Sequence, residues 1–263
     1  MSNPRYVLHA RSYGIAVSCG INGSTTLHDD TGEGRSFYRP INEWIMPEGN
    51  LITGLIFQPP GGVLPDGSPA GGADAFVHLE LITADESGSI VLDQPPLATY
   101  RWPNPSRPAV LPLPVMAPIP ALQPVATKLW LEAERVERIQ AQDRIHIAAL
   151  VNALIDALAS QDRAKVLQLL DYRLEDEARA RMQAPEAVKT SAGNLVASFT
   201  KSPKAPPHLQ PEQAMFVPVA AGKAWHVQRG WMQPAVLFDG DDVELSIEVY
   251  ASKVKGAWII SRG

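Results

Sequence analysis

The sequence is poor in cysteine and carries no excess of positive charge. A single cysteine, Cys19, among 263 residues excludes an intramolecular disulfide and any zinc or iron–sulfur site built from several cysteines. Cys19 lies in an apolar run with Ile15 and Val17, so we expect a small buried hydrophobe in a strand. The net charge of −5 repels phosphate backbones and argues against nucleic-acid binding.

Long apolar runs are also missing. No stretch approaches the roughly 18 apolar residues that a membrane-spanning helix needs. The N-terminus lacks a basic segment followed by an apolar one, which a secretory signal would show. Together with the lack of disulfides, which suits a reducing compartment, this predicts a cytoplasmic protein without membrane contact.

The usual catalytic motifs are absent from the sequence. It contains no Gly-x-Ser-x-Gly elbow, no His-Glu-x-x-His and no Gly-x-x-x-x-Gly-Lys phosphate loop. The glycines between Gly61 and Gly72 lie among prolines, and no helix follows them to receive a phosphate. We therefore expect no catalytic residue, no cofactor and no resident metal, and the sequence favours a non-enzyme.

Residues 1–102 show strand patterns joined by turn residues. Asn22-Gly23 is a strong hairpin signal, because both residues tolerate the positive φ of a type I′ turn. Ala75–Thr83 alternates apolar residues on one face with Phe76, His78, Glu80 and Ile82 on the other. Several short strands without a helical period predict an all-β antiparallel sandwich, jelly-roll-like in type.

Trp44 lies between Pro40 and Pro47 and allows two interpretations. An exposed tryptophan would be a partner-binding residue, since tryptophan is enriched in interaction hot spots. A buried tryptophan would instead plug one end of the sandwich. A sugar-binding sandwich is a third hypothesis, and it would need exposed aromatic side chains on one sheet face.

Proline crowds residues 103–126, interleaved with apolar residues. This density excludes a helix or a central strand and favours extended chain. A free linker would be polar, so we predict an apolar connector that packs along a domain surface. A recognition segment for a proline-binding module is the alternative.

Residues 127–263 change first to a helical period and then back to strands. Within Asp143–Ala159, apolar residues from Ile147 to Leu158 form one stripe, and Ser160-Gln161-Asp162 ends this helix and caps the next. Arg173–Arg181 alternates acids and bases, typical of a solvated helical face. Strands are predicted at Met215–Ala220, Trp225–Trp231, Val243–Tyr250 and Ala257–Arg262. The pattern predicts a second, α+β domain with helices packed on a curved antiparallel sheet.

The segment from Ala153 to Asp162, the Val166–Leu170 helix and the closing Gly-Ala-Trp-Ile-Ile-Ser-Arg strand resemble the NTF2-like (cystatin-related cone) class. The resemblance covers about residues 143–263 and departs from the class in Gly193–Gln213, where four prolines fall. It implies a cone whose concave sheet face meets the helices around a cavity. Members include isomerases, dehydratases and non-enzymatic binding domains.

Such a cavity would gather polar and aromatic side chains from neighbouring strands. The candidate ligand-binding residues are His226, Arg229, Glu244, Glu248, Tyr250 and Trp258. Two weaker candidates lie in the first half. His28-Asp29-Asp30 has the donors of a metal site or is a solvated loop, and His78 with Glu80 is an acid–base pair or ordinary surface polarity.

Two functional hypotheses follow. The first is a non-enzymatic binding protein of the bacterial accessory, adaptor or immunity type, with a protein as its partner. The alternative is a domain that binds or converts a small molecule in its C-terminal cavity. Both rest on patterns rather than on a motif.

Overall fold

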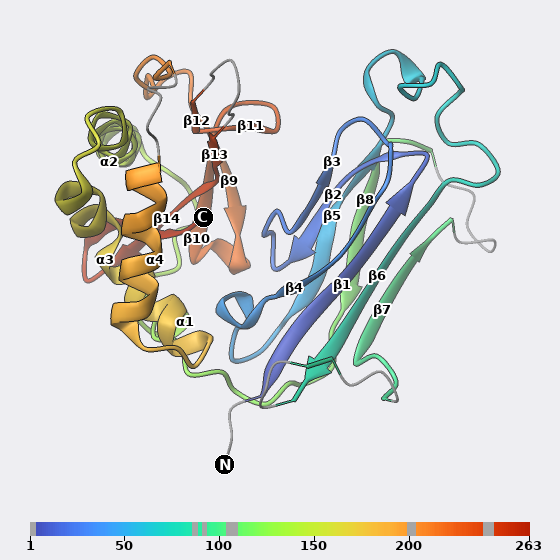
Figure 1. Ribbon diagram of the computed structural model, residues 1–263, viewed down its shortest axis with the longest axis horizontal. Coiled ribbons are helices and arrows are strands. Elements are labelled where there is room, and N and C mark those ends of the chain that lie inside the picture. Colours follow the sequence, from blue (N-terminus) through green and yellow to red (C-terminus); the bar gives the residue numbers. More distant parts are fainter. Residues whose placement is uncertain (1–3, 86–88, 91–93, 104–109, 199–203, 239–244) are drawn as a thin grey trace. The chain divides into compact units, whose positions relative to one another are not determined.

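The computed structural model describes residues 4–85, 89–90, 94–103, 110–198, 204–238 and 245–263 (Figure 1). The chain divides into two compact units, Met1–Ala126 and Thr127–Gly263. Across the described residues the sheets are antiparallel, and the four α-helices all belong to the second unit. None of the helices in this part of the chain has the length and apolarity of a membrane span.

The first unit contains two four-stranded antiparallel sheets, ordered β4-β1-β6-β7 and β3-β2-β5-β8. Their strands are β1 (Arg5–Tyr13), β2 (Ala16–Ile21), β3 (Leu27–Asp29), β4 (Arg35–Pro40), β5 (Leu51–Phe57), β6 (Phe76–Ala84), β7 (Ala98–Trp102) and β8 (Leu113–Pro118). Two short 3₁₀ turns, η1 (Asn42–Trp44) and η2 (Pro60–Gly62), interrupt the connections.

Side-chain alternation decides which face of each strand is buried. On β6, Val77, Leu79 and Leu81 are fully buried, which confirms the strand predicted at Ala75–Thr83. On β2, Cys19 is 1% exposed, as expected for a small apolar residue in a strand. The residues between the buried ones on β6 form the opposite face of the sheet.

The Asn22-Gly23 turn directly follows β2. Both residues have positive φ, 55° and 90°, as the sequence predicts for this turn. The Asn22 side chain also donates to the carbonyl of Trp44 at 2.7 Å and accepts from the backbone N–H of Leu51 at 2.9 Å. The turn therefore fixes η1 and the start of β5 as well as its own hairpin.

The proline-rich range 103–126, predicted as a connector, contains strand β8 (Leu113–Pro118). This strand pairs with β5 and lies at the edge of its sheet. An edge strand tolerates proline, because one side of its backbone needs no ladder hydrogen bond. The range thus contributes a strand to the first unit in addition to linking it onward.

The second unit combines helices with antiparallel sheets. Its helices are α1 (Leu129–Glu132), α2 (Ala141–Ala159), α3 (Arg163–Ala180) and α4 (Pro185–Ser198). Its strands are β9 (Met215–Val219), β10 (Ala224–Gly230), β11 (Gln233–Pro234), β12 (Val236–Phe238), β13 (Leu245–Ile247), β14 (Val249–Val254) and β15 (Ala257–Arg262), and a 3₁₀ turn, η3, spans Ala220–Gly222. The main sheet runs β11-β10-β14-β15 with β9 also on β10, while β12 and β13 form a separate pair.

The junction between α2 and α3 has the N-terminal helix cap that the sequence predicts. The Asp162 side chain accepts from the backbone N–H of Lys165 at 2.9 Å and so caps α3. Val151 and Leu154 of α2 and Trp225, Val249 and Ile260 of the sheet belong to one apolar core. The helices therefore cover the sheet face that carries Trp225.

Three predictions about the second unit are corrected by the structure. Val243–Tyr250 is not one strand, because Glu248 separates β13 from β14 and the two pair in different sheets. Gly193 lies inside α4 instead of in unpatterned chain. The helical face at Arg173–Arg181 is not fully solvated, since Asp176 is 1% and Glu177 5% exposed.

Candidate functional site

Six side chains gather on one face of the first unit's β4-β1-β6-β7 sheet. This histidine–arginine face consists of His9 and Arg11 on β1, Tyr38 on β4, His78 and Glu80 on β6, and Arg101 on β7. The strand register creates it. His9 lies opposite both Tyr38 and Glu80, and His78 lies opposite both Arg11 and Arg101. Alternation directs these residues away from the buried face of β6.

Glu80 bridges the two histidines of this face. Its Oε2 lies 3.2 Å from His9 Nδ1, and its Oε1 lies 3.2 Å from His78 Nε2. The His9 ring also stacks on Tyr38, with the ring centroids 4.1 Å apart. The carboxylate and the stacked ring hold both imidazoles in place, so the predicted pairing of His78 with Glu80 is present and extends to His9.

His78 is additionally held between two arginines. Arg11 Nη2 lies 2.5 Å from its Nδ1, and Arg101 Nε lies 2.8 Å from its Nε2. A neutral imidazole has only one lone pair, so it can accept from just one of these two donors at a time. Partial burial lowers the pKa of His78, and the positive charges of Arg101, Arg11 and His9 lower it further, while Glu80 opposes them.

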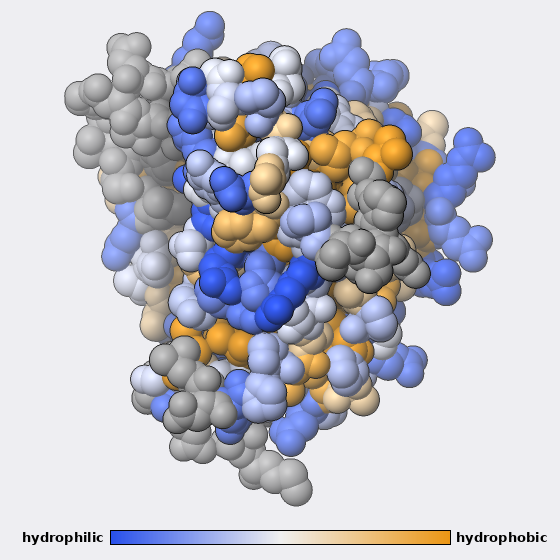
Figure 2. Space-filling model, turned by 90° about the vertical axis from the view of Figure 1, so that its right-hand side faces the viewer, coloured by the Kyte–Doolittle hydropathy of each residue, from blue (hydrophilic) through white to orange (hydrophobic). Residues whose placement is uncertain are grey.

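Exposed aromatic residues lie within the histidine–arginine face and beside it. Tyr13 and Tyr38 are each 45% exposed and Phe76 is 38% exposed. Tyr13 and Phe76 lie opposite each other at the end of the β1–β6 pair. Figure 2 views this side of the first unit and shows strongly hydrophilic side chains gathered between hydrophobic ones. The face therefore combines fixed charge with aromatic surface.

Trp44 does not act as an exposed loop-tip residue. It lies in η1, is 8% exposed, and its carbonyl accepts from Asn22. Of the two interpretations of Trp44, the structure supports the buried one. The apolar segment between Pro40 and Pro47 places the ring in the core because its neighbours Ile41 and Ile45 are buried too.

In the second unit, three of the six predicted ligand-binding residues come together. His226 Nε2 lies 2.5 Å from Glu248 Oε2, and its ring stacks on Tyr250 with centroids 4.4 Å apart. His226 Nδ1 lies 3.2 Å from Gln228 Nε2. A donated amide hydrogen at Nδ1 places the imidazole proton on Nε2, facing the carboxylate. The pair has the geometry of a histidine oriented by an acid.

The other predicted residues lie apart from this pair. The Nη2 of Arg229 donates to the Pro207 carbonyl at 2.5 Å, and burial lowers the pKa of Arg229. Trp258 Nε1 donates to Asp143 Oδ1 at 2.7 Å and belongs to the apolar core. Glu244 lies outside the described residues. The predicted six-residue site is therefore not assembled as one cluster.

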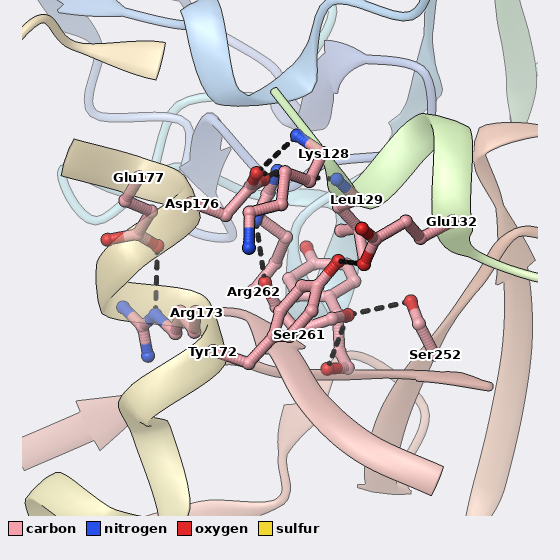
Figure 3. A network of polar contacts seen from close by, with 11 residues as sticks. Lys128, Leu129, Glu132, Tyr172, Arg173, Asp176, Glu177, Ser252, Ser261 and Arg262 are labelled. Atoms are coloured by element: carbon pink, nitrogen blue, oxygen red, sulfur yellow. Dashed lines mark hydrogen bonds and ion pairs between the residues drawn. The ribbon is translucent and has the colours of Figure 1, made fainter. Parts of the chain in front are cut away.

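A buried polar network in the second unit was missed by the sequence analysis (Figure 3). Arg262 Nη2 and Asp176 Oδ2 lie 2.5 Å apart, and the other carboxylate oxygen accepts from the backbone of Lys128 at 2.5 Å and Leu129 at 3.3 Å. Nearby, Tyr172 donates to Glu132 at 2.9 Å. Figure 3 shows these groups pointing toward one another. Because they are paired among themselves, they indicate a structural role rather than a ligand-binding site.

The pKa of Tyr172 in this network lies above its ordinary value. Burial raises the pKa of Tyr172, and its hydrogen bond to Glu132 raises it further. A hydroxyl held in its protonated form donates a hydrogen bond without acting as a base. This property also suits a structural role.

The His28-Asp29-Asp30 segment does not present a metal site. Asp29 is 1% exposed, and its carboxylate accepts from the backbone N–H groups of Thr31, Gly32 and Gly34 at 3.2, 2.8 and 3.0 Å. These hydrogen bonds from the following backbone N–H groups to the Asp29 carboxylate stabilise a turn. Within the described ranges, no group of three or more histidine, cysteine or acidic side chains is arranged to hold a metal ion.

The residues that complete the histidine–arginine face were not singled out from the sequence. His9 and Arg11 lie on β1 and Arg101 lies on β7, and the pairing of these strands with β6 is non-local. A period-two pattern in Arg5–Tyr13, with His9 and Arg11 on one face, was the available signal. It becomes informative only once β1 is known to lie beside β6.

Comparisons of the chain with protein-family models, with curated proteins and with solved structures found no match.

Proposed function

We propose that the protein is a non-enzymatic binding protein that docks an acidic segment of a partner protein on its histidine–arginine face. The observation that carries the proposal is the charge balance of that face. Among the described residues of this face, Glu80 is the one carboxylate beside Arg11 and Arg101, and it already contacts both histidines as well as Arg101 at 3.9 Å. A carboxylate from a partner would complete the charge pairing.

The exposure of the two arginines differs and suggests distinct roles. The Arg101 side chain is 70% exposed, so it is the group that a partner meets first. Arg11 is half-buried, and its Nε has no hydrogen-bond partner among the described residues. A guanidinium offers a planar fork of donors that suits a carboxylate, which makes these two side chains the recognition elements.

A protein is favoured over other anionic partners by the surroundings of the charges. Tyr13, Tyr38 and Phe76 supply exposed aromatic surface around them, and aromatic residues with arginine dominate protein–protein hot spots. The net charge of −5 opposes every polyanion at long range, and it opposes the closely spaced phosphates of nucleic acid most strongly. An extended segment rich in Asp and Glu with interspersed apolar residues fits best.

The wider architecture is part of the same proposal. The first unit is taken as a jelly-roll-like sandwich domain, supported by two four-stranded antiparallel sheets that Figure 1 draws as separate layers. The second is taken as an NTF2-like domain, supported by helices α2 and α3 packed against β15. Adaptor or immunity-type proteins of the cytoplasm, with an acidic target, are the class we propose.

The test uses poly-L-glutamate as the acidic probe and the full-length protein. Titration followed by NMR should shift the backbone signals of β1, β6 and β7, and binding should weaken as salt rises. The double variant Arg11→Glu with Arg101→Glu should lose at least 10-fold in affinity. The double variant Arg35→Glu with Arg39→Glu is the matched control, because both arginines lie on β4 of the same sheet, opposite Ser12 and Leu8, and are exposed.

Two results would overturn the proposal. Equal affinity of the double variant and the wild-type protein would show that the face does not recognise carboxylates. Equal loss in the Arg35→Glu, Arg39→Glu control would show that only the overall charge matters. Circular dichroism of each variant ensures that the losses are compared between folded proteins.

A further inference from the structure

A pocket of about 470 Å³ opens in the second unit at the start of α2. Its lining includes Arg138 and Gln140 just before the helix, Arg144 in its first turns, and the aromatic rings of Phe216 on β9 and Trp225 on β10. This volume lies in the range of small-molecule sites, about 300–1,000 Å³. None of the six ligand-binding residues predicted from the sequence is among its described lining residues.

Arg144 is held in a fixed position at this pocket. Its Nη1 donates to the carbonyls of Pro211 and Ala214, each at 3.3 Å. Its guanidinium carbon lies 5.0 Å from the centroid of the Phe216 ring. A guanidinium has five donor hydrogens, so those on Nε and Nη2 remain for another acceptor. The described residues place no carboxylate within ion-pair distance of this side chain.

The aromatic wall contains an unsatisfied donor. Trp225 is 6% exposed, and its indole Nε1 has no hydrogen-bond partner among the described residues. Buried indole N–H groups are normally paired. Phe216 pairs with Val227 in the β9–β10 register, one alternation step from the Trp225–Pro218 pair, so both rings lie on the same sheet face. The wall can therefore receive a planar apolar group.

The N-terminal end of α2 borders the pocket, whose lining carries two arginines, Arg138 and Arg144, and one glutamate. Ala141 and Gln140 belong to the lining, and the helix that follows has 19 residues. That end is already capped, because Asp143 in the first turn accepts from the backbone N–H of Gln140 at 3.0 Å, so the positive charge of the pocket comes from Arg138 and Arg144. Glu137, which also lines the pocket, opposes a multiply charged ligand such as a phosphate. One negative charge on a planar apolar body matches this balance.

We propose that this pocket binds a small aromatic monocarboxylate. Its ring contacts Phe216 and Trp225, and its carboxylate accepts from Arg144. This site lies in the second unit and is independent of the docking face, which belongs to the first. Loss of binding at the pocket therefore leaves binding at the histidine–arginine face measurable, and the reverse also holds.

The test compares three probes of the same shape. These are 1-naphthoate, the neutral 1-naphthylmethanol and the cationic 1-naphthylmethylammonium, titrated into the full-length protein by calorimetry and by NMR of the indole N–H signals. Trp225→Phe assigns the relevant indole signal. We expect 1-naphthoate to bind at least 10-fold more tightly than either other probe and to shift the Trp225 signal.

Variants locate the site. Arg144→Gln should weaken 1-naphthoate binding at least 10-fold, and Arg179→Gln, an exposed arginine on α3, should leave it unchanged. Phe216→Leu keeps the charge and should weaken binding as well, which covers the case in which Arg144→Gln does not fold. The proposal is overturned if 1-naphthoate does not bind, if the alcohol binds equally well, or if the folded variants bind like the wild-type protein.

Discussion

Asp176 and Arg262 form an ion pair whose side chains are 1% and 0% exposed, with 2.5 Å between Oδ2 and Nη2. The pair joins α3 to the last strand, β15. It also reaches α1, because Asp176 accepts from the backbone of Leu129, and the Arg262 guanidinium lies 5.1 Å from the Trp130 ring centroid. The Asp176 carboxylate therefore connects α1, α3 and β15, which are far apart in sequence.

Removing this carboxylate should destabilise the second unit strongly. Asp176→Ala leaves the Arg262 charge buried without its partner, which costs about 3–5 kcal/mol. Urea denaturation monitored by tryptophan fluorescence measures the loss. Asp171→Ala is the control, since the Asp171 side chain is 55% exposed in its pair with Lys189 and should change stability by less than about 1 kcal/mol. Similar effects of the two substitutions would contradict the assigned role of Asp176.

The Cys19 thiol should be unreactive in the folded protein. Burial raises the pKa of Cys19 to about 12, so almost no thiolate, the reactive form, is present at pH 8. A thiol-specific disulfide reagent should label it only after urea unfolds the chain. The control is Asp74→Cys in a Cys19→Ser background; position 74 is exposed, so this thiol should react at once. Rapid labelling of native Cys19 would show that β2 opens readily.

The stability of the first unit should fall in mild acid because of His78. Its pKa is lowered in the folded state, so below the ordinary value of 6.5 the unfolded chain binds more protons than the folded one. Stabilisation is therefore complete above pH 6.5 and is lost as the pH falls toward the lowered pKa. His78→Gln should flatten this dependence, measured by urea unfolding followed through the NMR signals of β1 and β6.

His146→Gln provides the comparison, because His146 is exposed on α2 of the second unit. Its first-unit unfolding curve should keep the wild-type dependence on pH. An unchanged dependence in His78→Gln would assign the acid sensitivity to other groups. An acidic partner should act in the opposite direction, favouring protonated His78, so that binding to poly-L-glutamate tightens as the pH falls.

Local patterns predicted much of the fold, and non-local pairing limited the rest. Alternation placed His78 and Glu80 on one face of β6, and the helical stripe together with Asp162 located α2 and the start of α3. The contact between His9 and Glu80 joins residues 71 positions apart. No period within one segment reveals which strand lies beside it, so the histidine–arginine face could not be assembled from the sequence.

The acidic residues of α3 show the same limit. Asp176 and Glu177 have the charge pattern of a solvated face, and a helix surface is the usual place for such residues. Their burial depends on Arg262, which lies 86 positions from Asp176, and on Arg173, which donates to Glu177 at 2.8 Å. A buried carboxylate is identifiable only when its cationic partner is known.

The His226–Glu248 contact predicts one tautomer of the imidazole. Because Gln228 donates weakly to Nδ1 and Glu248 accepts at Nε2, the two contacts together should place the proton of the neutral ring on Nε2, pointing at the carboxylate. Long-range ¹H–¹⁵N spectra distinguish the two nitrogens at neutral pH. Glu248→Ala removes the acceptor and should produce a mixture of tautomers, whereas Glu186→Ala, an exposed position in the first turn of α4, should not. A wild-type ring protonated on Nδ1 alone would require the Gln228 amide to face the other way and would remove Glu248 as the orienting group.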